Sequence, residues 1–447
     1  MSPIPVITSP ELRVLAIIVS FGNTDVDACY LNIIRLYEVL SKQLQQHPED
    51  QQFWPNFSPD HKIILARGAT GPLEGESHTA QYFHGRDGLG DISKRFPEYN
   101  TATYAPGDDH PHLVLTNKSG VDVALDLIQS EPSESISYLV LGPMTTLAQV
   151  VKKSGETFKQ RIGRVICMGG ALDVPGNTSP VAEFNFFADP YAVHSLLTPS
   201  PTSDFPLSKF LLLPLDITTP HELPFPYYSS IIDPTFSIRG RRTDPDKPLT
   251  SFTSAFLERT REVMMSFGKA AMELHDICVV WCAIDHPSLT DPSGPWKFSK
   301  REFTIERTGE ITRGMLVIDW RDDQGAYAPG ANRAAVQAEL EKHPEFHPLG
   351  TLESTAVPAQ VEVEDAAHAH PPPSQGTFRR QGAVDTTSVT AQLQAEDVVH
   401  AEPVPSVKPV PAPRSLEDGE GVIVVRETPG SEKLLRLLAK RVWGVDR

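Results

Sequence analysis

The chain has 447 residues, of which 40% are hydrophobic, and a formal net charge of −17. This length allows a large buried core, and the acidic excess argues against binding to a phosphate backbone, because nucleic-acid-binding proteins need a basic face. No apolar run approaches the roughly 20 residues that span a bilayer, and the first ten residues do not resemble a signal peptide. We therefore expect a cytoplasmic protein that binds neither nucleic acid nor membranes.

Short apolar segments alternate with segments of helical period through the first half of the chain. The apolar runs predict buried strands at residues 14–19, 62–65, 112–115, 138–141, 165–168 and 210–215. The three- and four-residue spacing of apolar side chains predicts helices at residues 26–40, 121–128, 145–151 and 191–197. This alternation indicates an α/β fold with an open, mostly parallel, doubly wound sheet and helices on both faces. In such folds functional residues lie at the carboxyl ends of the strands.

Composition and hydrophobic period divide the chain into three regions. Residues 1–344 form the expected core, in which residues 251–285 look largely helical and residues 301–307 pair with 315–319 as strands. Residues 345–418 are rich in Ala, Pro and Glu without a hydrophobic period, so we expect a disordered insertion that serves as a linker or a partner-binding strip. Residues 419–447 predict a terminal strand and helix that return to the core.

A polar segment follows the strand that ends in Met168. Asn177, Glu183 and Asn185 occur within nine residues of one another, and their amides and carboxylate suit a sugar whose hydroxyls need both donors and acceptors. The alternative is a polar turn in which Asn and Glu cap the helix that begins near Asp189. The segment thus predicts either a ribose site or a helix cap.

A second pair of candidates is His275 and Asp276, which open an apolar helical segment. Asp276 has two interpretations: a charge favoured by the helix dipole, or a hard oxygen ligand for calcium. His275 titrates near neutrality and can donate a proton to a departing base.

Three further candidates follow predicted strands or glycine-rich turns. Thr145 lies where a strand turns directly into a helix, which leaves backbone carbonyls free for a cation. Asn23 follows the first strand and can project over the sheet edge, whereas Asp25 and Asp27 are interpreted as charges at a helix N-terminus. His84 leads a glycine-rich loop without the lysine and preceding strand of a P-loop, so phosphate binding is not expected.

Eight segments, taken in order, resemble the inosine-uridine preferring nucleoside hydrolase family. They are residues 21–27 (FGNTDVD), 84–90 (HGRDGLG), 142–146 (GPMTT), 168–170 (MGG), 179–185 (SPVAEFN), 214–218 (PLDIT), 275–276 (HD) and 313–315 (RGM). The resemblance covers roughly residues 9–320 and the terminal strand and helix. It implies an open α/β fold that binds one calcium ion and cleaves the N-glycosidic bond of ribonucleosides with water.

The resemblance also implies a role for each matching residue. The expected ribose contacts are Asn23, Asn177, Glu183 and Asn185, with Met168 beside them and His84 lining the pocket. Calcium would be bound by the Thr145 carbonyl and the Asp276 carboxylate, and His275 would be the acid that assists the departing base. Because the transition state resembles an oxocarbenium ion, Glu183 would help more as positive charge develops.

The chain departs from the family at its opening, where a hydrophobic strand should run into a D-T-D-P-G-x-D-D loop. Those aspartates supply most calcium ligands and the base that activates water, so the calcium site is incomplete. We expect that the true start lies upstream, and that this chain is a nucleosidase with little or no activity. The alternative is a noncatalytic nucleoside-binding or interaction protein that uses the Pro-rich insertion. The base preference and the oligomeric state both stay open, and homo-oligomers are common in this fold.

Overall fold

The computed structural model describes residues 3–101, 104–198, 205–236, 243–289, 291, 293–319 and 421–445. The chain divides into two units, and the first comprises Met1–Trp320 and Ala412–Arg447. The second unit, Arg321–Pro411, and the whole of the expected insertion at 345–418 lie outside the described residues. No helix among the described residues is long and apolar enough to cross a membrane.

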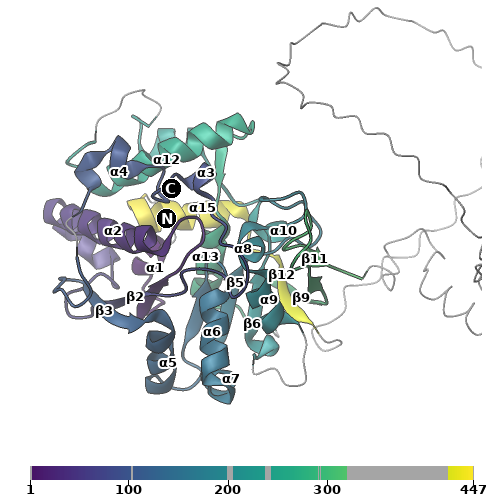
Figure 1. Cartoon of the computed structure of the whole chain (residues 1–447). Helices are drawn as coiled ribbons and strands as arrows, with labels where there is room; N and C mark the ends of the chain where they lie inside the picture. Colours follow the sequence, from purple (N-terminus) through teal and green to yellow (C-terminus); the bar gives the residue numbers. More distant parts are fainter. Residues whose placement is uncertain are drawn as a thin grey trace, which may run out of the picture. The chain divides into compact units, whose positions relative to one another are not determined.

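The strands of the first unit form two main sheets (Figure 1). Three parallel strands have the order β1-β2-β3, with bounds Ala16–Val19, Ile63–Arg67 and Leu113–Ser119. Five strands have the order β4-β5-β6-β12-β9, with bounds Ser137–Val140, Arg164–Met168, Phe210–Leu213, Val422–Glu427 and Lys297–Arg301. The first four of these are parallel, and β9 is antiparallel at the edge. The expected α/β class with mostly parallel strands is confirmed.

The terminal segment completes the larger sheet. β12 lies between β6 and β9, and the helix α15, Ser431–Trp443, follows it. Leu434, Leu438 and Val442 of this helix are buried, as its apolar face predicted. The last described residues of the chain therefore contribute a strand and a helix to the same unit as residues 3–319.

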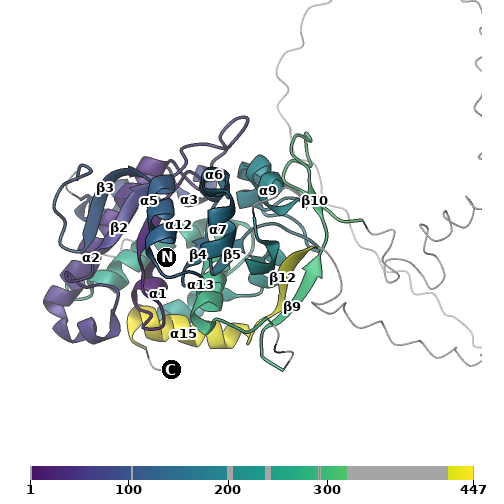
Figure 2. The same ribbon diagram turned by 90° about the horizontal axis from the view of Figure 1, so that it is seen from below.

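Helices cover both faces of the strands and enclose two hydrophobic cores (Figure 2). One core receives side chains from α1, α2, α12, α13 and α15, with bounds Pro3–Ile7, Val26–Gln46, Pro248–Ser266, His275–Asp285 and Ser431–Trp443. The other receives side chains from α5, α6, α7 and α9, with bounds Gly120–Ser130, Thr145–Ser154, Glu156–Arg161 and Pro190–Leu197. β5 and β6 lie between the two cores, which explains their continuous apolar sequences.

The two sheets are separated between β1 and β4, each of which is an edge strand. Both strands contribute apolar side chains to both cores. Ile17 and Leu139 pack against one core, while Ile18 and Tyr138 pack against the other. β1 and β4 thus present the same two faces, although no described strand pairs with them on this side. The first described strand of the chain is β1.

The segment expected to be largely helical at 251–285 is interrupted. α12 ends at Ser266, and the short strand β8, Ala271–Glu273, separates it from α13. β8 pairs with β7, Glu222–Pro224, in an antiparallel arrangement. The expectation that residues 251–285 are largely helical is confirmed, with one interruption where pairing with β7, which is distant in sequence, fixes three residues as a strand.

The remaining elements are short. The expected strand pair near residues 301–319 is smaller than predicted, with β10, Thr304–Ile305, antiparallel to β11, Leu316–Val317. Short α-helices are α3 (Gln81–His84), α4 (Ile92–Arg95), α8 (Phe184–Ala188), α10 (Leu215–Thr218) and α11 (Phe225–Tyr227). The 3-10 helices η1, η2 and η3 span Pro48–Phe53, Pro97–Tyr99 and Leu207–Lys209, and the π-helix η4 spans Tyr228–Ile232.

Candidate active site

The loops that carry the expected site residues meet around one small buried cluster. It consists of Phe21, Ala69, Ala80, Phe184 and Ala188. These side chains come from the loops after β1 and β2, from the residue before α3, and from α8. Because β1 and β2 are paired parallel strands, the loops that follow them leave the same edge of their sheet. The cluster therefore holds the segments of Asn23, His84 and Glu183 near one another.

Glu183 is the N-cap of α8, and it is only 2% exposed. Its Oε1 accepts a hydrogen bond from the Asn185 N–H at 2.8 Å. Its Oε2 accepts from the N–H groups of Gly170 at 2.9 Å and Phe186 at 3.1 Å. Glu183 thus caps a helix, but that helix is α8, whereas the helix expected near Asp189 is α9 and is capped by Asp189 itself. The cap also fixes the position of this carboxyl group between the end of β5 and α8.

Asn177 and Asn185 are ordered by the same elements. The Oδ1 of Asn177 accepts from the Phe184 N–H at 2.9 Å, and among the described residues its Nδ2 has no hydrogen-bond partner. The Nδ2 of Asn185, a residue that is 7% exposed, donates to the Met168 carbonyl at 3.2 Å. The structure therefore brings together Met168, Asn177, Glu183 and Asn185, and the Asn177 amide is available to a ligand hydroxyl.

Electrostatics place His275 at the same site. Burial raises the pKa of Glu183, and three backbone N–H groups and the nearby His275 oppose that rise. His275 opens α13, which packs against β5 and β4. Its Nδ1 lies 2.8 Å from the Thr218 Oγ1, and its Nε2 lies 3.0 Å from the Glu273 Oε2. Both ring nitrogens are therefore engaged by neighbouring side chains.

Asn23 and His84 lie on loops that are bonded to each other. Asn23 itself is exposed, but the adjacent Thr24 is buried and donates from Oγ1 to the Arg86 carbonyl at 2.7 Å. Asp87 organises the loop of His84, since its carboxylate accepts from the backbone N–H of three following residues, Leu89, Asp91 and Ser93. Burial lowers the pKa of His84 to about 4. His84 is therefore neutral at physiological pH, which suits contact with an uncharged ligand.

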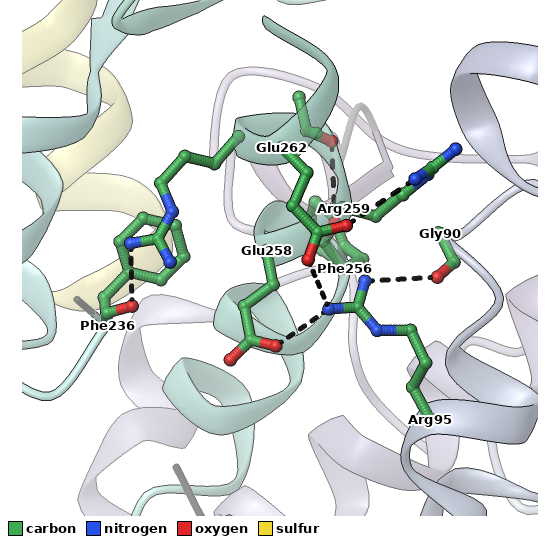
Figure 3. A network of polar contacts seen from close by, with 9 residues as sticks. Gly90, Arg95, Phe236, Phe256, Glu258, Arg259 and Glu262 are labelled. Atoms are coloured by element: carbon green, nitrogen blue, oxygen red, sulfur yellow. Dashed lines mark hydrogen bonds and ion pairs between the residues drawn. The ribbon is translucent and has the colours of Figure 1, made fainter. Parts of the chain in front are cut away.

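A polar network fastens this loop to α12 (Figure 3). The Gly90 N–H donates to the His84 carbonyl at 2.6 Å, and the Gly90 carbonyl accepts from Arg95 at 3.5 Å. Arg95 also bonds to Glu258 at 3.0 Å and Glu262 at 3.4 Å, both on α12. Gly90 has a φ of +73°, and a Cβ there would lie 2.6 Å from the Arg259 Cβ. The close approach of loop and helix thus requires glycine at this position.

Thr145 is fully buried at the start of α6. Its hydroxyl donates to the Asp189 Oδ2 at 2.5 Å, and the same oxygen accepts from the Leu73 N–H at 2.8 Å. The Asp189 Oδ1 accepts from the Ala192 N–H at 3.0 Å and caps α9. Asp189 therefore fixes the position of Thr145 relative to the end of α8.

The described residues do not by themselves fit a calcium ion. They contain no group of three or more His, Cys, Asp or Glu side chains arranged to hold a metal. Asp25 caps α2 through the Ala28 N–H, and Asp27 pairs with Arg67, as expected of charges at a helix N-terminus. Calcium takes six to eight oxygen ligands, and the two expected donors, the Thr145 carbonyl and the Asp276 carboxylate, fall short of that number.

Sequence reasoning missed three residues of the site. Thr218 and Glu273 contact His275, and Asp189 contacts Thr145. Asp189 carried a usable signal, because Asp followed by Pro marks a helix N-terminus. Glu273 and Thr218 carried none, since their role depends on side-chain directions between separate elements.

The sequence of this chain is similar to those of known proteins. The sequence profile of "Inosine-uridine preferring nucleoside hydrolase" matches residues 3–347. The chain is similar to the inosine-uridine preferring nucleoside hydrolase of Leishmania major, with 25% identity over 309 residues, or 69% of this chain and 84% of the relative. It is also similar to a pyrimidine-specific ribonucleoside hydrolase of Salmonella arizonae, with 26% identity over 70% of this chain and 82% of that protein.

A solved structure shares the fold. The purine-preferring ribonucleoside hydrolase from Gardnerella vaginalis superimposes with a TM-score of 0.51 and 20% sequence identity. The superposition covers 72% of this chain and 85% of that protein. At this identity the likeness concerns the fold alone.

Proposed function

Because the chain belongs to the inosine-uridine preferring nucleoside hydrolase family, we propose that its residues bind a ribonucleoside whose N-glycosidic bond is hydrolysed to ribose and free base. We propose further that hydrolysis requires a D-T-D-P-G-x-D-D segment, which these 447 residues do not contain and which would complete a calcium site, and that this chain alone has little or no activity. In the completed site, calcium would be bound by the Thr145 carbonyl and the Asp276 carboxylate. The ion would supply Lewis-acid chemistry to the attacking water.

The observation that carries this proposal is the convergence of sugar-binding groups on the buried carboxylate of Glu183. Asn177, Glu183, Asn185 and Met168 are tied together by hydrogen bonds between side chains and backbone at the end of β5. Such preorganised groups need no rearrangement when charge develops. Glu183 is held in place by its three N–H donors. Its negative charge would therefore stabilise the positively charged, oxocarbenium-like transition state more than it stabilises the neutral ground state. Asn23 and His84 would complete the pocket from the facing loops.

His275 would donate a proton to the departing base. A purine or pyrimidine leaves poorly as an anion, so protonation lowers the barrier to cleavage. The influence of His275 on the pKa of Glu183 supports its place beside the sugar site. None of the residues named for ribose binding distinguishes purine from pyrimidine, and the similar proteins include both a purine-preferring and a pyrimidine-specific hydrolase.

Binding is the direct test of the sugar site. Inosine, uridine and their 2′- and 3′-deoxy analogues would be titrated into the purified chain by calorimetry. We expect the ribonucleosides to bind more tightly than the deoxy analogues, and Glu183→Ala to abolish that difference. Glu156→Ala is the matched control, because Glu156 also lies at a helix start but is exposed on α7. Equal affinity for ribo- and deoxynucleosides would contradict the proposal.

The incomplete set of calcium donors favours a second candidate, a noncatalytic nucleoside-binding or interaction protein that uses the Pro-rich segment at 345–418 as a docking strip. It would bind nucleosides without turnover even when an upstream aspartate segment is supplied. It would also bind its partner only while the Pro-rich segment is present.

The remaining assignments are also proposals. The net charge of −17 supports a protein that does not bind nucleic acid or anionic membranes. A cytoplasmic location and a homo-oligomeric state are proposed on the resemblance to the family.

A further inference from the structure

We propose that Glu273 is a positioning residue for His275, which it holds as the tautomer with a proton on Nε2 and with a fixed ring plane. This inference rests on the role proposed for His275. The observation that suggests it is the Glu273 Oε2, which lies 3.0 Å from the His275 Nε2 in a partly buried site.

The state of the carboxylate decides the direction of this hydrogen bond. The bond to His275 and the ion pair with Lys269 lower the pKa of Glu273 to about 2. An ionised carboxylate only accepts hydrogen bonds, so the proton between the two groups must be carried by Nε2. A carboxylate that fixes the tautomer of a histidine in this way is a recurrent device in enzyme sites.

The other ring nitrogen of His275, Nδ1, can be either protonated or unprotonated beside its neighbour. The Thr218 hydroxyl lies 2.8 Å from Nδ1, and it also reaches the Pro214 carbonyl at 3.2 Å. A hydroxyl both donates and accepts, so Thr218 can serve Nδ1 with or without a proton. The two neighbours of the ring are therefore unequal: Glu273 fixes one nitrogen, and Thr218 accommodates either state of the other.

The backbone around Glu273 makes this arrangement rigid. Glu273 closes β8 opposite Glu222 of β7, and the following Leu274 N–H donates to the His221 carbonyl at 2.8 Å. The paired strands β7 and β8 thus place the carboxylate before α13 begins at His275. A side chain anchored on a strand holds its partner more firmly than one anchored on a free loop.

The tautomer can be measured without catalysis. Full-length protein with 15N-labelled histidine is examined by NMR at pH 7.5, and a His275→Asn sample identifies the signal. We expect Nε2 of His275 to carry the proton in the wild type. In Glu273→Ala the tautomer ratio should move toward Nδ1–H by about 10- to 100-fold, the factor associated with a hydrogen bond to a charged group.

Matched variants separate positioning from general destabilisation. Glu222→Ala removes a carboxylate from the facing strand, and Lys269→Ala removes the other partner of Glu273; both should leave the ring signals unchanged. If Glu273→Ala fails to fold, Glu273→Gln replaces it, and faster exchange of the Nε2 proton is expected because a neutral acceptor binds it less strongly. An unchanged tautomer and exchange rate in the folded Glu273 variant would overturn the proposal. Because turnover is not the readout, this failure is distinct from a failure of the sugar-binding test.

Discussion

Replacement of Asp189 by Asn tests how firmly the buried carboxylate joins the start of α6, the end of α8 and the start of α9. Asp189 is fully buried and accepts three hydrogen bonds, two on Oδ2 and one on Oδ1. The best orientation of an Asn amide keeps the bonds from Thr145 and Leu73 and turns its NH2 group toward the Ala192 N–H. One buried donor then loses its acceptor, which costs about 1–3 kcal/mol.

The assay is equilibrium unfolding in urea, followed by fluorescence. Asp25→Asn is the control, because Asp25 also caps a helix, through the Ala28 N–H at 2.8 Å, but is exposed. Asn caps a helix about as well as Asp, so this control should change the free energy of unfolding by less than about 0.5 kcal/mol. Equal losses in the two variants would refute the claim that the buried network of Asp189 does more than cap a helix.

Two further predictions concern other parts of the unit. Burial lowers the pKa of His110 to about 4, and its ring is only 2% exposed. In the unfolded chain His110 is protonated below about pH 6.5, whereas in the folded protein the ring stays neutral down to about pH 4. Its contribution to the free energy of unfolding is therefore complete above pH 6.5 and falls by up to about 3 kcal/mol as the pH drops toward 4. His110→Asn, which keeps an acceptor for the backbone, should flatten that slope in urea unfolding, and an unchanged slope would contradict the assignment. Arg95→Ala removes the contacts with Glu258, Glu262 and the Gly90 carbonyl. It should cost about 1 kcal/mol and speed amide hydrogen exchange at residues 85–91, whereas Lys118→Ala, at an exposed ion pair, should do neither.

The strands and long helices could be predicted from the sequence because burial dominates their composition. The apolar run at 165–168 matches β5 within one residue, and the helical period at 145–151 begins at the same residue as α6. A strand between two cores must be apolar on both sides, which leaves a clear pattern. The residues that bring polar groups to the sheet edge were found in the same way, since they follow these strands.

The parts that could not be predicted depend on contacts between distant segments. β8 has three residues, and its pairing with β7 leaves no period to detect. Glu183 could be read as a sugar ligand or as a helix cap, and its three backbone donors show that the cap is real without excluding a ligand. The separation of the sheet between β1 and β4 is likewise a property of the whole fold.

The most direct test of the account is ribose release from inosine and uridine with calcium present. The 447-residue chain would be compared with the same chain extended at its N-terminus by the natural upstream sequence, provided that this contains a D-T-D-P-G-x-D-D segment. The account predicts little or no release by the 447-residue chain, calcium-dependent release by the extended chain, and loss of that release in an extended Glu183→Ala variant. Rapid release by the 447-residue chain, or none by a folded extended chain, would contradict it.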